Sequence, residues 1–206
     1  MATLLNGRRL TRSFYDRDAP AVARDLIGCV FLHDHPPGRV GVRLVEVEAY
    51  RGEQDPGSHG YRGETQRTRT MFGPPGRLYV YFTYGMHWCA NVVCGAPGTC
   101  EAVLLRAGEP VIGAENMRTR RPRIVDDRLL ASGPARLAQA MGIGREHDGA
   151  TLLRGGRMWM VEDAVTAEFR AREIAQTARV GLAPGRGEAI PWRFVVPGHP
   201  YASRPR

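Results

Sequence analysis

The segment that most constrains the fold is residues 40–50, VGVRLVEVEAY, which is rich in β-branched residues and contains no proline. Such side chains favour an extended backbone, so the segment predicts one long strand. Side chains alternate between the two faces of a strand. We therefore expect Glu46, Glu48 and Tyr50 on one face, and the small apolar residues between them on the other.

Other β-prone runs predict strands at residues 29–32, 78–83, 86–94, 102–107, 158–161 and 193–196, with Tyr84-Gly85 as a hairpin turn. Capping and glycine signals predict helices at residues 18–28, 111–120 and 134–141, the last capped by Ser132-Gly133. No repeat or composition shift divides the chain. We predict one α+β domain over residues 1–206, with a curved, mostly antiparallel sheet, flanking helices, and residues 1–15 as a loosely ordered lead-in.

Residues 51–76 are rich in glycine, proline, arginine and threonine and show no helical or strand period. This predicts a long loop between the first long strand and the hairpin. Loops of such length inside a domain are usually functional or disordered.

The charge balance bears on possible partners. The 29 basic residues against 21 acidic ones give a net charge of +8, and all 29 are arginine. A guanidinium cannot act as an amine nucleophile, so lysine Schiff-base chemistry is excluded. Guanidinium groups bind phosphates well, which favours nucleic acid as a partner. A merely solvated basic surface explains the charge equally well.

Cysteine and histidine spacing gives no sign of a metal. The four cysteines form no C-x-x-C pair and the six histidines no H-x-x-x-H pair, so we predict neither a structural metal nor a cofactor. The apolar runs are too short to span a membrane, and no export signal opens the chain. We therefore expect a protein that works inside the cell, without a membrane partner.

Two carboxylates and a phenol on one strand face allow three interpretations. Alternating acids such as Glu46 and Glu48 are typical of a solvated strand face. The same face could supply a general base whose pKa is set by burial beside an aromatic ring. A metal nuclease using both glutamates is a weaker alternative, because no aspartate cluster accompanies them.

The predicted hairpin is unusually aromatic. Tyr79 and Tyr81 share one face, with Tyr84 and Met86 at the tip. Hairpin tips normally carry small, solvated residues, so an aromatic tip on a basic protein suggests stacking on bases or a wedge inserted into duplex DNA. A hairpin whose tip is buried in the core is the structural alternative.

Three motifs occur in order along the chain: E-A-Y at residues 48–50, Y-V-Y-x-x-Y-G-M at 79–86 and L-L-R-A at 104–107, with His59 between the first two. Together with LLASGPARLAQAMGI at residues 129–143, they resemble the alkyladenine (3-methyladenine) DNA glycosylase family from about residue 22 to residue 194. The resemblance implies a monofunctional enzyme of base excision repair. Such an enzyme flips alkylated or deaminated purines out of DNA, hydrolyses the N-glycosidic bond and leaves an abasic site.

The resemblance also implies catalytic roles. Glu48 matches the general base that activates the attacking water. Arg106 matches the arginine beside that water, and Val180 matches the residue whose backbone carbonyl helps to hold it. The absence of lysine agrees with a glycosylase that has no strand-cleaving lyase activity.

The remaining matched residues bind DNA. Three of them form the base pocket, with Tyr50 and Tyr81 sandwiching the flipped base and His59 completing the box. Asn91 matches the asparagine that opposes a guanine 2-amino group. The intercalating tip is Tyr84 with Met86 beside it. Residues 86–88 and 94–98 depart from the family pattern, which puts the range of lesions in doubt rather than the reaction.

The partner implied is double-stranded DNA that contains damaged purines such as 3-methyladenine, 7-methylguanine, hypoxanthine or ethenoadenine. We expect a monomer, in the cytoplasm at the nucleoid of a bacterium, or in the nucleus of a eukaryote. The alternative from another class is a non-catalytic nucleic-acid-binding module with the fold of a formyltransferase C-terminal domain. Glu48 distinguishes the two, because a binder gains nothing from a carboxylate facing phosphates.

Overall fold

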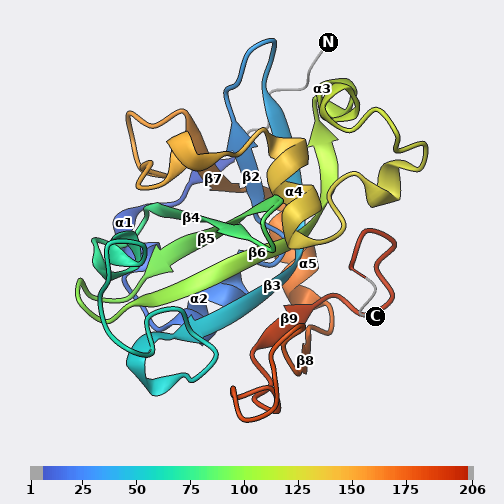
Figure 1. Cartoon of the computed structure of the whole chain (residues 1–206). Helices are drawn as coiled ribbons and strands as arrows, with labels where there is room; N and C mark the ends of the chain where they lie inside the picture. Colours follow the sequence, from blue (N-terminus) through green and yellow to red (C-terminus); the bar gives the residue numbers. More distant parts are fainter. Residues whose placement is uncertain (1–6, 204–206) are drawn as a thin grey trace.

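The predicted long strand is present as β3 (Val40–Arg51) and lies at the centre of the sheet in a computed structural model that describes residues 7–203 (Figure 1). The strand order is β1-β7-β2-β3-β6-β5-β4, with β9 pairing both β3 and β8. Each of these pairings is antiparallel. With its helices, the sheet confirms the α+β class.

The bounds of the other elements follow. The strands are β1 (Arg8–Arg9), β2 (Val30–His33), β4 (Leu78–Thr83), β5 (His87–Cys94), β6 (Glu101–Ile112), β7 (Met158–Glu162), β8 (Ala175–Thr177) and β9 (Arg193–Val195). The α-helices are α1 (Arg12–Tyr15), α2 (Ala19–Leu26), α3 (Ala114–Arg120), α4 (Pro134–Met141) and α5 (Ala164–Ala171). Short 3-10 turns cover Gly52–Gln54, Arg69–Phe72, Asp127–Leu129 and Arg145–His147.

Strand β3 changes its partner along its length on one side. Its first residues, 40–43, pair with β2, whereas residues 46–48 pair with β9, and β6 runs along the other side throughout. Figure 1 shows β9 next to β3, although the two are far apart in the sequence. The register with β6 shifts on both sides of Glu46. The two glutamates of β3 therefore lie in the interior of the sheet, with a strand on each side.

A buried ion pair closes the point where β2 and β3 separate. Arg43 Nη1 and Nη2 donate to the two carboxylate oxygens of Asp163 at 2.9 and 2.7 Å, and Nη1 also donates to the Gly28 carbonyl at 2.7 Å. Gly28 has a φ of +85°, and a side chain there would lie 2.5 Å from Phe169 Cβ. The end of α2 and the start of α5 thus meet at a position that requires glycine.

Three predictions differ from the structure. The helix predicted over residues 111–120 begins at Ala114, because β6 continues along β3 as far as Ile112. Ser132 does not cap α4; the cap is Gly133, and the Ser132 hydroxyl instead donates to the Ala202 carbonyl at 3.3 Å.

The third difference concerns the predicted lead-in over residues 1–15, of which residues 1–6 lie outside the described part of the chain. Residues 7–15 are not loosely attached. Strand β1 pairs with β7, and Leu10 and Tyr15 are buried in the core, 4% and 0% exposed. Short segments without periodicity still order when they cover an open sheet edge and bury an aromatic ring.

No helix within residues 7–203 is long and apolar enough to span a membrane.

Gly28→Ala should lower the free energy of unfolding by about 2–5 kcal/mol, combining the cost of a left-handed alanine with overpacking against Phe169. Gly98→Ala is the matched control, because Gly98 has a φ of +92° but no atom within 4 Å of the position of a new Cβ. It should cost only the backbone part, about 1–2 kcal/mol. Urea unfolding of both variants measures the difference, and equal losses would contradict the packing at the α2–α5 junction.

Candidate active site

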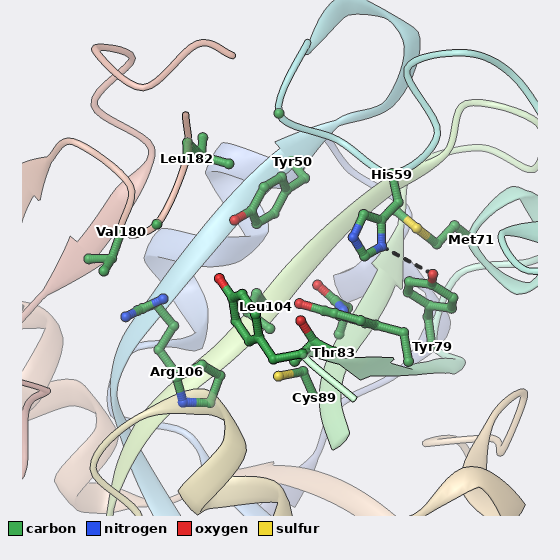
Figure 2. Close-up of a pocket in the computed structure, with 16 residues that line it drawn as sticks. Tyr50, His59, Met71, Tyr79, Thr83, Cys89, Leu104, Arg106, Val180 and Leu182 are labelled. Atoms are coloured by element: carbon green, nitrogen blue, oxygen red, sulfur yellow. Dashed lines mark hydrogen bonds between the residues drawn. The ribbon is translucent and has the colours of Figure 1, made fainter. Parts of the chain in front are cut away.

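A cavity of about 210 Å³ opens where β3, β4, β5 and the segment after β8 meet. Seven of the predicted site residues line it: Tyr50, His59, Tyr81, Tyr84, Asn91, Arg106 and Val180. Figure 2 shows several of them arranged around this space, together with lining residues that the sequence did not single out as site residues: Met71, Tyr79, Thr83, Cys89, Leu104 and Leu182. Residues from distant parts of the chain therefore converge on one pocket.

Glu48 is fully buried and does not itself line the cavity, but three residues that contact it do: Tyr50, Arg106 and Val180. The Tyr50 hydroxyl donates to its Oε2 at 2.9 Å, and the Val180 backbone N–H donates to its Oε1 at 2.8 Å. Arg106 Nη1 lies 3.2 Å from Oε1. Because a carboxylate can accept about four hydrogen bonds, this arrangement leaves capacity for one more donor, such as a water.

Arg106 also joins Glu48 to the second glutamate of the strand. Its Nε donates to Glu46 Oε1 at 2.7 Å, and Arg193 Nε donates to the same oxygen at 2.8 Å. Ser203 completes the set, with its N–H donating to Oε2 at 2.6 Å. Burial alone would raise the pKa of Glu46, but the charges and hydrogen bonds of Arg106 and Arg193 outweigh burial and hold the pKa below its usual value.

These contacts decide between the interpretations of the strand face. The solvated face is wrong, because Glu46 and Glu48 are both fully buried by β6 and β9. The metal nuclease is disfavoured by the donor set, because Arg106 and Arg193 already neutralise Glu46 and would repel a cation. Across residues 7–203, no group of three or more His, Cys, Asp or Glu is placed to hold a metal ion.

Aromatic rings form the walls of the pocket. The His59 ring meets the Tyr81 ring edge-on, with centroids 4.5 Å apart, and Tyr79 stacks on Tyr81 at 5.6 Å. His59 Nδ1 and the Tyr79 hydroxyl are hydrogen-bonded at 3.1 Å. Burial and the adjacent Glu48 raise the pKa of Tyr50 well above its usual value, so its hydroxyl stays protonated as a donor.

The charge state of His59 matters for what the pocket can hold. Its ring opens on the pocket, but desolvation, aided by the charge of Arg67, lowers the pKa of His59 to about 4. The imidazole is therefore neutral at physiological pH. A neutral aromatic box accepts either a neutral ring or a cationic one, whereas an imidazolium would repel a cation.

Asn91 lies in β5 opposite Tyr79 and is 4% exposed. Its Nδ2 is buried without a hydrogen-bond partner in the described part of the chain. A buried amide without a partner is costly, so its presence in a pocket wall points to a role toward a bound group.

The hairpin tip is solvent-exposed, so the alternative of a tip buried in the core is wrong. Tyr84 is 81% exposed and Met86 is 68% exposed. Tyr84 has a φ of +51° and Gly85 of +66°, which turns the chain within the three residues between Thr83 and His87. Tyr84 also lines the cavity, whereas Met86 does not.

Several partners of the site were missed from the sequence. Arg193 and Ser203 hold Glu46 from the C-terminal part of the chain. The Val180 N–H donates to Glu48, and the role of the Val180 carbonyl toward a water stays a prediction. No local motif marks Arg193 or Ser203. The pairing of β9 with β3 brings Arg193 to Glu46, and Ser203 reaches Glu46 from the segment that follows β9.

A neutral aromatic pocket above a buried carboxylate, on an antiparallel α+β scaffold, is suited to general acid–base chemistry on a flat ring. The family model described as Methylpurine-DNA glycosylase (MPG) matches residues 13–200. The chain belongs to this family, which makes it a DNA glycosylase of DNA repair.

Three relatives are similar in sequence to this chain over nearly its whole length. A Burkholderia lata protein named "Putative 3-methyladenine DNA glycosylase" is 49% identical over 199 residues, which cover 97% of this chain and 93% of that protein. A Methanoculleus marisnigri protein of the same name is 48% identical over 197 residues, covering 95% of this chain and 98% of that protein. A third, from Streptomyces avermitilis, is 46% identical over 196 residues, covering 94% and 90%.

His59 should make stability depend on pH in a defined direction. Its folded pKa of about 4 lies below the usual value of 6.5. As the pH falls below 6.5, the unfolded chain takes up the proton first, so the free energy of unfolding falls until the pH reaches about 4. His59→Gln cannot titrate and should lose less stability over this range than the wild type. Urea unfolding at several pH values measures the slopes, and identical slopes would contradict a neutral His59.

Proposed function

We propose that the protein releases alkylated or deaminated purines from double-stranded DNA by hydrolysing the N-glycosidic bond. The observation that carries the proposal is the buried Glu48, held by Tyr50, Val180 and Arg106 directly beneath an aromatic pocket. The lesion class extends to 3-methyladenine, 7-methylguanine, hypoxanthine and ethenoadenine.

The pocket requires that the base leave the duplex. A base inside the stack cannot reach a carboxylate that is fully buried, so the nucleotide has to rotate into the cavity. Flipping costs a few kcal/mol and is cheapest for damaged or weakly paired bases. Stacking between Tyr50 and Tyr81, with His59 at the side, offsets part of this cost.

Hydrolysis then uses the free hydrogen-bonding capacity of Glu48. A water donating to the carboxylate attacks C1′ of the deoxyribose, and its proton passes to Glu48. The C1′–N bond breaks, its electron pair leaves with the purine, and C1′ keeps the hydroxyl. The Tyr50 hydroxyl and the Val180 N–H fix the orientation of the carboxylate, and Arg106 Nη1 lies beside it at 3.2 Å.

Selectivity follows from the pocket walls. Alkylation can make a purine cationic, which improves it as a leaving group and favours the π faces of a neutral aromatic box. Asn91 of β5 lines the pocket. We propose that its side chain excludes guanine by opposing the 2-amino group. Neutral lesions such as hypoxanthine depend more on the shape of the pocket.

The protein should leave an intact abasic site. Strand cleavage by β-elimination needs an amine that forms a Schiff base with C1′, and none of the 29 basic side chains is a lysine. The DNA strand should therefore break at the abasic site only after alkali treatment.

A second hollow, of about 930 Å³, adjoins the pocket and shares Arg106 and Val180 with it. Its border includes Arg136 and the ion pair of Arg128 with Asp126, whose charged atoms are 2.8 Å apart. The Arg136 guanidinium suits a phosphate beside a flipped nucleotide, a contact that positions the duplex without reading its sequence. The exposed Tyr84 lies at the rim, where we propose that it enters the minor groove and fills the gap left by the base.

Glu48→Gln should abolish base release while binding of damaged duplex is retained, because the amide keeps the size of the side chain and loses the base. The measurement incubates the protein with duplexes containing 7-methylguanine or hypoxanthine and scores alkali-dependent breaks and free base. Glu64→Gln, at an exposed glutamate paired with Arg69, is the matched control and should release base normally. Turnover by the Glu48 variant would refute the general base. Absence of release by the wild type, with binding retained, would favour the binding module.

Tyr84→Ala should weaken binding of lesion-containing duplex by about 5- to 150-fold, because loss of one stacking or wedging aromatic costs about 1–3 kcal/mol. Phe82→Ala is the matched control, since Phe82 is 46% exposed on the same hairpin but packs on Trp88 and does not line the cavity. Fluorescence titration with lesion and undamaged duplexes separates the two variants. Equal effects of both substitutions would contradict the wedge.

A further inference from the structure

A fully buried ion pair joins Arg179 to Asp55, and neither residue contacts Glu46 or Glu48 directly. Arg179 Nη2 donates to Asp55 Oδ1 at 2.7 Å and Nη1 to Oδ2 at 2.5 Å, and both side chains are 0% exposed. Neither residue lines the cavity. The pair is therefore outside the set of groups that could touch a flipped base.

The guanidinium of Arg179 connects three separate segments. Its Nη1 donates to the Ala49 carbonyl of β3 at 3.1 Å, and its Nη2 donates to the Gly187 carbonyl at 3.2 Å. Asp55 accepts backbone N–H groups from Arg51 at 3.2 Å and Gly57 at 2.9 Å, which folds the loop that follows β3.

The same guanidinium stacks on aromatic rings. Its Cζ lies 4.6 Å from the ring centroid of Tyr50 and 5.2 Å from that of Trp192. Glycines make room for it: a Cβ at Gly57 would lie 2.9 Å from Arg179 Nη2, and one at Gly187 would lie 3.1 Å away. This site therefore fits a flat guanidinium, and an ammonium group could not reproduce both the stacking and the bidentate pair.

We infer that Arg179, fixed by Asp55, is a positioning residue for Glu48. Arg179 precedes Val180, whose N–H donates to Glu48 Oε1, and it stacks on Tyr50, whose hydroxyl donates to Glu48 Oε2. One guanidinium thus fixes the positions of two of the three groups that donate to the Glu48 carboxylate, and it does so without touching Glu48. The inference rests on the proposed function, in which Glu48 is the general base.

The chain offers a matched control for a purely structural role. Arg43 of β3 and Asp163 form another buried, bidentate pair, 6% and 7% exposed, and neither residue lines the cavity. Replacing either arginine with lysine removes one bidentate contact and keeps the charge. Loss of stability should then be similar for the two variants, whereas only the Arg179 change should disturb Glu48.

The test compares Arg179→Lys, Arg43→Lys and the wild type on a hypoxanthine duplex, well below the melting temperature of each. Arg179→Lys should lower the single-turnover rate constant at saturating enzyme by up to about 100-fold, as expected when a reacting group shifts by about 1 Å. The protein concentration that gives half the maximal rate should change much less. Arg43→Lys should keep the wild-type rate constant.

Asp55→Asn is the second variant, in case Arg179→Lys does not fold; it keeps the shape of the side chain and should lower the rate constant in the same way. The inference would be overturned if Arg179→Lys and Asp55→Asn both had the same rate constant as Arg43→Lys. Failure of the proposed function is seen separately, because the wild-type arm would then release no base.

Discussion

The structure depends on accommodating two carboxylates inside a β-sheet. Glu46 and Glu48 are fully buried, and an unpaired buried carboxylate would cost far more than the stability of a domain. Arg106 contacts both, Arg193 contacts Glu46, and Ser203 supplies hydrogen bonds. The pairing of β9 with β3 brings Arg193 to this point, so the C-terminal part of the chain is needed to neutralise a site built by its first half.

The two glutamates have different surroundings, and the difference agrees with the role proposed for Glu48 alone. Glu46 is surrounded by arginine and serine donors, so its oxygens have little capacity left for a substrate. Glu48 is held by a phenol, a backbone amide and one arginine, and it borders the cavity through them. One strand therefore carries a carboxylate that is closed in by its donors and, two residues later, the carboxylate to which the proposed function assigns the chemistry.

How much could be predicted from the sequence depends on the range of each interaction. The β-branched run at residues 40–50 and the Tyr84-Gly85 turn act locally, and both predicted strands of the hairpin are present with small shifts of their ends. The alternation of side chains also predicts that Glu46 and Glu48 share a face. The burial of that face could not be predicted, because it depends on β9, which lies more than a hundred residues away in the sequence. The short elements α5 and β8 were missed for the same reason: their signals are weak, and packing against the sheet stabilises them.

The exclusive use of arginine gains a structural meaning at the buried positions. Arg43, Arg106 and Arg179 each bind a carboxylate in the interior and at the same time reach a backbone carbonyl, a second carboxylate or an aromatic ring. A planar group with five donors can make such contacts together, while an ammonium supplies a single point of charge. Coding bias can account for arginines on the surface, but these three positions demand the guanidinium itself. The absence of lysine therefore agrees with the architecture of the pocket and with the proposal that the reaction ends at the abasic site.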